Sequence, residues 1–301
     1  MPELDVNSVS IAYETHGDAS HPAIMLIQGL GMPLIAWPPQ FIDHLTAAGF
    51  FVITMDNRDI GMSTTFHDAG TPNLAWHWFK SKVGLRSRPL YSLKDMAQDV
   101  ASLLSRLGIQ HAHIVGVSMG GMIGQRFTIE HAERCLSFTS IMSTTGNPRL
   151  PKPAPEVIRK LIQRPKSEDI EDRLAHSMAM GQIISSPGFD VDFDYLEQRL
   201  RAMYARGMTR GGIARQMLAI GSDGNRAPEL RKVKVPTLVI HGKEDPLIPV
   251  SGGVDTAEAM PNARLELIDG MGHDLPPGLH ERLATLIIEH ARSSDSSVAA
   301  A

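Results

Sequence analysis

A serine between two glycines is the residue whose setting most clearly indicates chemistry. Residues 116–120 read Gly-Val-Ser-Met-Gly, directly after a β-rich run and directly before a helical pattern. In a strand–turn–helix setting, Gly-x-Ser-x-Gly is typical of a nucleophile elbow, whose tight turn exposes the serine hydroxyl above the edge of a sheet. The N-terminus of the following helix favours developing negative charge. Ser118 is therefore the predicted nucleophile, and the alternative is that it only caps the helix.

A serine hydroxyl needs a base to take its proton and an acid to orient that base. In this architecture the order along the chain is serine, acid, histidine. Asp245 follows the apolar run Thr237–His241, and His273 follows the run Arg264–Ile268 in a short loop that contains glycine. Because both come after predicted strands, at the sheet edge where sites of α/β proteins form, we predict that they are the acid and the base.

Three neighbouring side chains compete with this pair. His241 is the best rival for the base, but it ends an apolar run and is expected to point sideways. Asp274 cannot easily orient His273, since the two are adjacent in the chain, and Glu244 is expected to face solvent. Asp245 and His273 therefore remain the predicted acid and base.

A second glycine turn, Gln28-Gly29-Leu30-Gly31, closes the buried apolar run that begins at Ala23. Such a turn can hold a phosphate, bind an anion that forms during catalysis, or simply reverse the chain. The turn lacks the third glycine of a dinucleotide fingerprint, and no lysine–serine pair follows it as a P-loop requires. The phosphate interpretation is therefore disfavoured, and the other two remain.

The composition is that of an ordinary globular chain. It has 301 residues, of which 43% are hydrophobic and 21% are charged, and its formal net charge is −4. A negative net charge of this size does not predict binding to nucleic acid or to an anionic membrane. The single cysteine, Cys135, excludes an internal disulfide, the N-terminus lacks the features of a signal peptide, and no run approaches the roughly 18 apolar residues of a membrane span. We expect a cytoplasmic monomer or homodimer.

The elements that must position these residues alternate along the chain. β-rich runs occur at Ser10–Thr15, Ala23–Gln28, Phe50–Met55, His113–Val117, Leu136–Met142, Thr237–His241 and Arg264–Ile268. Helical patterns occur at Gln40–Ala48, Leu93–Leu107, Met119–His131, Gly253–Met260 and Leu279–Arg292. Alternating strands and helices predict a mostly parallel sheet that is covered on both faces. The opening strands lack a helix between them, which predicts an antiparallel hairpin at one edge.

One segment, residues 145–227, interrupts this alternation. It contains no convincing strand, opens with several prolines, and continues with a helical, methionine-rich composition. We predict a helical cap there, inserted into a core formed by residues 1–144 and 228–293, with a disordered tail at 294–301. Met180 and Met217 are predicted to line an adaptable apolar pocket, although methionines also fill cores. The tryptophans Trp37, Trp76 and Trp78 either line the pocket or belong to the core.

Together these motifs resemble the α/β-hydrolase superfamily over nearly the whole chain. The resemblance is carried by the turn at 28–31, Asp-Asn-Arg-Asp-Ile-Gly-Met-Ser at 56–63, the elbow at 116–121, His-Gly-Lys-Glu-Asp at 241–245, and Gly-His at 272–273. The finer pattern is similar to serine esterases of the aclacinomycin methylesterase type. The resemblance implies an eight-stranded, mostly parallel sheet and a site without cofactor or metal. It also implies that Asp56 and Arg58 belong to the scaffold.

The resemblance gives the glycine turn a role in catalysis. Family members commonly have His-Gly there, followed by a residue whose backbone N–H binds the oxyanion. Gln28 stands in place of that histidine, but the backbone role needs only the turn. The N–H groups of Leu30 and Met119 are therefore the implied oxyanion donors, and Gly29 and Trp37 are expected beside the substrate.

The expected function is hydrolysis of carboxylic esters of small to medium, largely apolar molecules through an acyl-enzyme on Ser118. Serine at the elbow argues against dehalogenase and epoxide hydrolase relatives, which place aspartate there. Lactonase, carbon–carbon bond hydrolase and perhydrolase activities remain open, because the same three residues support them. From a different class, a non-catalytic receptor that keeps this fold also remains open.

Overall fold

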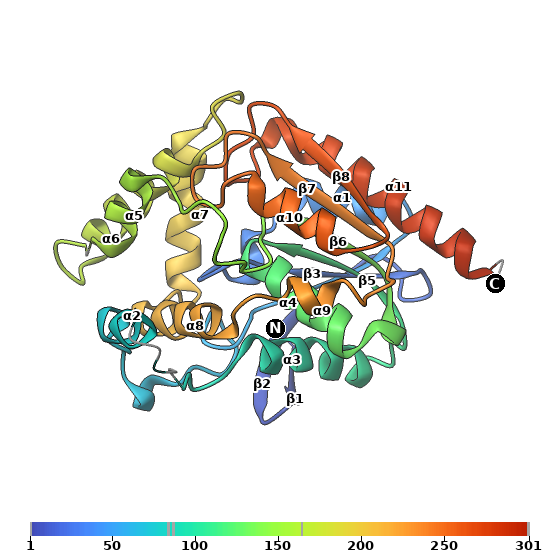
Figure 1. The fold of residues 1–301 in the computed structure, drawn as a ribbon, viewed down its shortest axis with the longest axis horizontal. Coiled ribbons are helices and arrows are strands. Elements are labelled where there is room, and N and C mark those ends of the chain that lie inside the picture. The colour runs from blue at the N-terminus through green and yellow to red at the C-terminus, as the bar shows by residue number, and fades with distance from the viewer. Residues whose placement is uncertain (1, 83–84, 86–87, 164, 300–301) are drawn as a thin grey trace.

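An eight-stranded sheet forms the centre of the computed structural model, which describes residues 2–82, 85, 88–163 and 165–299. The strand order is β1-β2-β4-β3-β5-β6-β7-β8 (Figure 1). The strands are β1 (Glu3–Val6), β2 (Val9–His16), β3 (Ala23–Ile27), β4 (Phe51–Met55), β5 (Ala112–Val117), β6 (Cys135–Ile141), β7 (Thr237–Gly242) and β8 (Ala263–Ile268). The pairs β1–β2 and β2–β4 are antiparallel and the others are parallel, so the predicted sheet with its antiparallel edge is confirmed.

The strand boundaries depart little from the prediction. Each of the seven predicted runs forms a strand whose ends differ by at most one residue from the prediction. The short edge strand β1 was not predicted, because an alternation of polar and apolar residues over only four positions is too short to indicate a strand.

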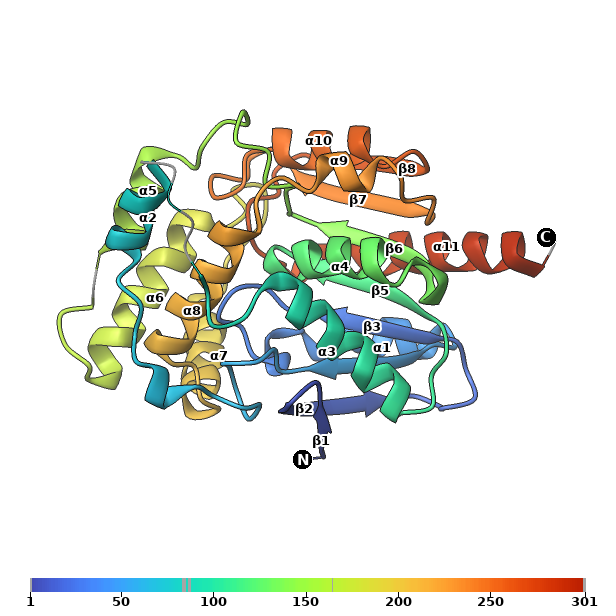
Figure 2. The ribbon, with the colours of Figure 1, turned by 60° about the horizontal axis from the view of Figure 1, so that its bottom comes forward.

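Helices cover both faces of the sheet (Figure 2). Helices α1 (Pro39–Ala47) and α11 (His280–Ala299) lie on one face, and α3 (Leu93–Arg106), α4 (Met119–Glu130), α9 (Ala227–Leu230) and α10 (Ser251–Ala259) lie on the other. Strand β3 serves both cores, because alternate side chains of a strand point to opposite faces. Ile24 and Leu26 join the core under α1 and α11, whereas Met25 and Ile27 join the core under α3 and α4. In the described part of the chain, no helix combines the length and hydropathy that a membrane crossing requires.

The segment between β6 and β7 is helical, as the sequence predicts. It contains α5 (Pro155–Ile162), α6 (Ile170–Ile184), α7 (Phe193–Ala205) and α8 (Arg210–Asp223), which lie together at one end of the sheet (Figure 1). These helices share a small apolar cluster with the loops of the core, in which Leu174, Leu200 and Met203 pack with Ile60. We refer to residues 145–227 as the cap. Helix α2 (Leu74–Lys82), which was not predicted, contacts α8.

The C-terminal helix extends beyond its predicted end. Helix α11 continues to Ala299, so the expected disordered tail does not begin at residue 294. Ser294 is buried and donates its hydroxyl to the carbonyl of His290, and Asp295 lies 3.3 Å from Nε2 of the buried His113. These tertiary contacts stabilise the helix, although the intrinsic helix propensity of this serine-rich segment does not favour it. Residues 300 and 301 of the predicted tail lie outside the described residues.

Buried ion pairs join the cap to the core. Arg206 at the end of α7 lies 2.8 Å from Asp56, and Arg215 of α8 lies 2.7 Å from Asp59. Asp56 also accepts hydrogen bonds from the backbone N–H groups of Leu34 and Met62, which agrees with a scaffold role. Since both carboxylates are fully buried, each needs its guanidinium partner to offset the cost of desolvation.

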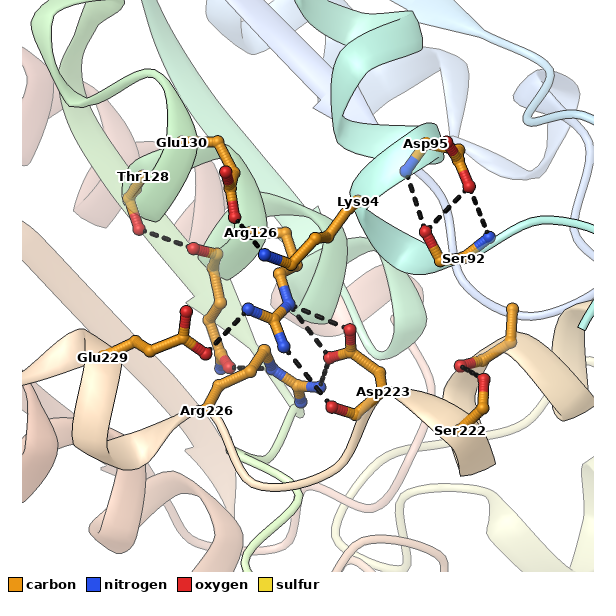
Figure 3. Close-up of polar contacts among 12 residues, drawn as sticks. Ser92, Lys94, Asp95, Arg126, Thr128, Glu130, Ser222, Asp223, Arg226 and Glu229 are labelled. Atoms are coloured by element: carbon orange, nitrogen blue, oxygen red, sulfur yellow. Dashed lines mark hydrogen bonds and ion pairs between the residues drawn. The ribbon is translucent and has the colours of Figure 1, made fainter. Parts of the chain in front are cut away.

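A second buried network fastens the C-terminal end of α8 to α4 (Figure 3). Asp223 accepts hydrogen bonds from Arg126 Nε at 2.9 Å and from Arg226 Nη1 at 2.5 Å. Arg226, whose side chain is 1% exposed, also donates to Gln125 Oε1 and to the carbonyl of Thr144. Asp223 thus pairs with two buried guanidinium groups, and Arg126 also pairs with Glu229 at 2.9 Å.

Replacement of Asp223 by alanine should destabilise the protein strongly, because it leaves Arg226 buried without its carboxylate partner and leaves Arg126 with Glu229 alone. Breaking a buried pair in this way typically costs about 3–5 kcal/mol. We expect a decrease of this size in the free energy of unfolding, measured by urea denaturation followed by circular dichroism. The matched control is Arg201→Ala, which removes exposed ion pairs with Glu171 and Glu197 and should leave the free energy of unfolding close to that of wild type. Equal losses in the two variants would contradict the importance of this network.

Candidate active site

Ser118 occupies a strained turn between β5 and α4. Its φ is 54°, in the left-handed region that non-glycine residues rarely adopt. Its backbone N–H donates to the carbonyl of Ile141 at 2.9 Å, and its own carbonyl accepts the hydroxyl of Ser143 at 2.8 Å. Its side chain makes no capping hydrogen bond to α4, so the alternative role as a helix cap is not supported. The hydroxyl is left to make other contacts.

Glycines allow the turn to form because neighbouring backbones approach it too closely for any side chain. A Cβ on Gly116 would lie 2.2 Å from the carbonyl oxygen of Gly120. A Cβ on Gly120 would lie 2.0 Å from the carbonyl oxygen of Ile27, at the end of β3. On the other side, a Cβ on Gly29 would lie 3.3 Å from Cβ of Ser118. The nucleophile turn and the turn after β3 are therefore in direct contact.

The structure brings together the three residues predicted to carry catalysis. His273 Nε2 lies 3.0 Å from Ser118 Oγ, and His273 Nδ1 lies 2.7 Å from Asp245 Oδ2. The residues follow β5, β7 and β8, whose carboxyl ends meet at one edge of the sheet. Asp245 and His273 are buried, at 6% and 8% exposure. In this geometry, a neutral imidazole with its proton on Nδ1 can accept the serine proton at Nε2.

The surroundings of Asp245 favour its charged form. Oδ1 accepts the backbone N–H groups of Leu247 and Ile248 at 2.9 and 2.8 Å, while Oδ2 faces His273. Burial alone would raise the pKa of Asp245, but the charge of His273 and hydrogen bonds from His241, His273 and the Ile248 N–H lower that pKa well below its usual value. The carboxylate therefore holds the imidazole in one orientation across the neutral pH range.

The three side chains that were alternatives to Asp245 and His273 make hydrogen bonds of their own. His241 is fully buried beside Asp245, with Nε2 at 2.8 Å from the carbonyl of Ile248 and 3.4 Å from Asp245 Oδ2. Glu244 is exposed, as expected, and accepts the N–H of Gly270. Asp274 accepts the hydroxyl of Ser186 from the cap, and its pKa is raised by burial.

Backbone and side-chain hydrogen bonds connect the loop that carries His273 to the end of α6 and to the cap residues that follow it. His273 N–H donates to the carbonyl of Ile184 at 2.8 Å, and Gly272 N–H donates to Ser186 Oγ at 2.8 Å. Gly188 N–H donates to the carbonyl of Gly270 at 2.9 Å. Sequence reasoning missed these contacts, since no local pattern connects residues more than 80 positions apart.

The turn after β3 presents its backbone to the nucleophile. Gln28, which replaces the histidine of the family pattern, is buried and accepts the N–H of Gly29 with its own Oε1 at 3.2 Å. Within the described part of the chain, no hydrogen bond occupies the N–H of Leu30 or of Met119. Both donors are thus available for a ligand oxygen, as the oxyanion prediction requires.

The predicted pocket residues have different surroundings. Trp37 is 1% exposed and stacks on Phe41 of α1 with ring centroids 5.4 Å apart, so it belongs to the core and its predicted pocket role is not supported. Met180 on α6 and Met217 on α8 are half-buried in the cap. Trp76 is 53% exposed on α2, and the side chain of Trp78 lies outside the described residues.

The chemistry that this arrangement can perform is proton transfer and nucleophilic attack by serine. It combines a hydroxyl, an imidazole, an ionised carboxylate and two unoccupied backbone donors. A search of the described residues finds no group of three or more His, Cys, Asp or Glu side chains placed to hold a metal ion.

Comparison with a family model gives a match to the alpha/beta hydrolase fold over residues 22–276. The match includes both glycine turns and all three residues of the hydrogen-bonded chain.

Relatives and solved structures extend this similarity to the whole chain. The chain is 28% identical to rhodomycin D methylesterase DauP of Streptomyces sp. (strain C5), with 96% of this chain and 97% of that protein covered. It is 26% identical to 3-oxoadipate enol-lactonase 2 of Acinetobacter baylyi, with 88% and 87% covered. In fold it resembles the meta-cleavage product hydrolase CumD of Pseudomonas fluorescens IP01, with a TM-score of 0.74, 18% identity and 98% of each chain covered.

Asp245→Asn should change how stability depends on pH. Because the pKa of Asp245 is lower in the folded state than in the unfolded chain, the carboxylate stabilises the fold above about pH 4 and loses this contribution as the pH falls further. We expect the difference in unfolding free energy between wild type and Asp245→Asn to shrink by about 1 kcal/mol between pH 5 and pH 3. Urea denaturation at several pH values measures it. In the control Ser118→Ala no carboxylate changes, so its difference from wild type should stay constant, whereas a pH-independent difference for Asp245→Asn would contradict the lowered pKa.

Proposed function

The chain belongs to the alpha/beta hydrolase fold family, and we propose that it is a serine hydrolase that cleaves carboxylic esters of small to medium, largely apolar molecules. The observation that carries the proposal is the hydrogen-bonded chain from Ser118 Oγ through His273 to Asp245. A serine next to an oriented, buried imidazole is equipped for acyl transfer.

The proposed reaction begins with attack of Ser118 Oγ on the ester carbonyl carbon while His273 Nε2 takes the hydroxyl proton. The carbonyl oxygen becomes an oxyanion, which the N–H groups of Leu30 and Met119 bind. Such donors stabilise the tetrahedral intermediate more than the planar ester, and each contributes about 3–4 kcal/mol to the lowering of the barrier. The intermediate collapses when the alkoxy group leaves with the proton from His273, which yields an alcohol and an acyl-enzyme.

Deacylation repeats these steps with water as the nucleophile. His273 takes a proton from water, the resulting hydroxide attacks the acyl carbon, and Ser118 leaves with the proton returned by the imidazole. The carboxylate of Asp245 stabilises the imidazolium in both halves of the reaction and is not itself protonated.

The relatives support an ester as the substrate and leave related acyl chemistry as an alternative. Rhodomycin D methylesterase, at 28% identity over nearly the full chain, is named for cleavage of a methyl ester. Enol-lactonase and 2-hydroxy-6-oxononadienedioate hydrolase relatives at 24–26% identity are named for lactone and other hydrolytic reactions. Two half-buried methionines of the cap, Met180 and Met217, favour an apolar acyl or alcohol group.

Ser118→Ala should abolish esterase activity while the fold is retained. With p-nitrophenyl esters of increasing acyl length and with methyl esters, kcat/KM should fall by about 10⁴-fold or more, since the nucleophile is removed. The measurement is steady-state release of p-nitrophenolate, or of acid from the methyl esters. The control Ser293→Ala removes an exposed hydroxyl on α11 and should keep wild-type kinetics.

The alternatives give different outcomes. A wild-type protein that binds esters without turnover would favour a non-catalytic receptor. The same panel can show faster turnover of lactones, peracid formation, or cleavage of a 2-hydroxy-6-oxo-dienoate. Any of these results would assign a different substrate class but keep Ser118 as the nucleophile. Retention of activity by Ser118→Ala would refute the proposed mechanism.

A further inference from the structure

The turn after β3 is held at three consecutive peptide groups. The N–H of Gly29 donates to Gln28 Oε1, and the carbonyl of Gln28 accepts Asn57 Nδ2 at 3.0 Å. The carbonyl of Gly29 accepts the N–H of Met32 at 3.3 Å. The N–H of Gly31 donates to Gln216 Oε1 at 2.8 Å.

These contacts fix the direction of the Leu30 N–H. In a trans peptide the N–H and C=O point in opposite directions, so the bond that engages the Gly29 carbonyl turns the Leu30 N–H the other way. The peptides on either side are held too, which hinders a flip of the central one. Among the described residues, no hydrogen bond engages the Leu30 N–H, which belongs to the turn that lies beside Ser118.

Gln216 is the part of this arrangement that comes from the cap. It lies on α8 and is 0% exposed. Its Oε1 accepts the N–H of Gly31, and its Nε2 donates to the carbonyl of Arg58 at 2.8 Å. One side-chain amide therefore joins the turn after β3 to the loop after β4.

The contact between α8 and the turn is also tight sterically. Ile213 lies three residues before Gln216 and hence on the same face of α8. Gly31 has a φ of 68°, and a Cβ on it would lie 2.8 Å from Cγ1 of Ile213. The Arg215–Asp59 ion pair holds α8 on the core, so the backbone that carries Gln216 is fixed in position relative to the turn.

We propose that Gln216 is a positioning residue of the oxyanion hole, through which the cap sets the backbone of the turn that donates to the substrate. The proposal rests on the proposed esterase function. Gln216 touches neither the hydrogen-bonded chain nor the reacting atoms, and it acts through the peptide of Gly31. Its loss should weaken binding of the oxyanion and leave binding of the ground-state ester almost unchanged, because the donors act mainly on the tetrahedral state.

The test compares Gln216→Met and Gln216→Glu with wild type. Methionine is unbranched and of similar length but forms neither hydrogen bond. Glutamate cannot donate to Arg58 when ionised and brings negative charge to the turn. For p-nitrophenyl butyrate we expect kcat to fall about 10- to 100-fold in both variants, with KM within about twofold of wild type. Affinity for an alkylboronic acid, whose tetrahedral adduct with Ser118 places an oxygen in the oxyanion hole, should fall by a similar factor.

The matched control is Gln98→Met, the same substitution at an exposed glutamine of α3 whose Nε2 donates to Ser102 Oγ at 3.1 Å. It should keep kcat, KM and boronic acid affinity near wild type, and all variants are assayed well below their melting temperatures. If the folded Gln216→Met variant, which removes the acceptor of the Gly31 N–H, keeps kcat and boronic acid affinity within twofold, the positioning role is refuted. If wild type itself hydrolyses no ester, the proposed function fails instead, so the two failures are distinguishable.

Discussion

The close contact of two backbone turns is the constraint on which the site depends. The end of β3 runs so near the first turn of α4 that a side chain at Gly120 would overlap the carbonyl of Ile27. This contact places the turn at 28–31 beside Ser118, which adopts a positive φ of 54°. Because the sheet, the serine turn and the turn at 28–31 are in contact, their backbone N–H groups are held in fixed orientations. An oxyanion formed at the serine would therefore be bound without reorganisation of the backbone.

The cap is built into this arrangement at several points. Buried ion pairs at Asp56 and Asp59 hold α7 and α8 on the core, and Asp223 fastens the end of α8 to α4. The same cap contacts the turn at 28–31 through Gln216 and the loop of His273 through Ser186. Charged groups that are buried this completely separate only at a large cost, which argues that these parts of the cap remain in place during turnover.

Much of the fold and the central residues of the site could be predicted from the sequence, because each carries its signal locally. Ser118 has its glycines beside it, and Asp245 and His273 each follow an apolar strand. Gln216 has no such signal, since its role depends on meeting Gly31 from 185 positions away. Trp37 has a local signal that is ambiguous. An aromatic residue near a turn fits a core and a pocket equally well, and only its packing on Phe41 assigns it to the core. The extension of α11 likewise depends on tertiary contacts that its serine-rich composition does not reveal.

The central claim is that Ser118 is an activated nucleophile. A fluorophosphonate forms a covalent bond with a serine hydroxyl only where a base activates it, and peptide mass spectrometry then locates the label. We predict one label per chain, on Ser118, and none in a His273→Ala variant that remains folded. An ester-hydrolysing wild-type protein that is labelled on another residue, or not at all, would contradict the account.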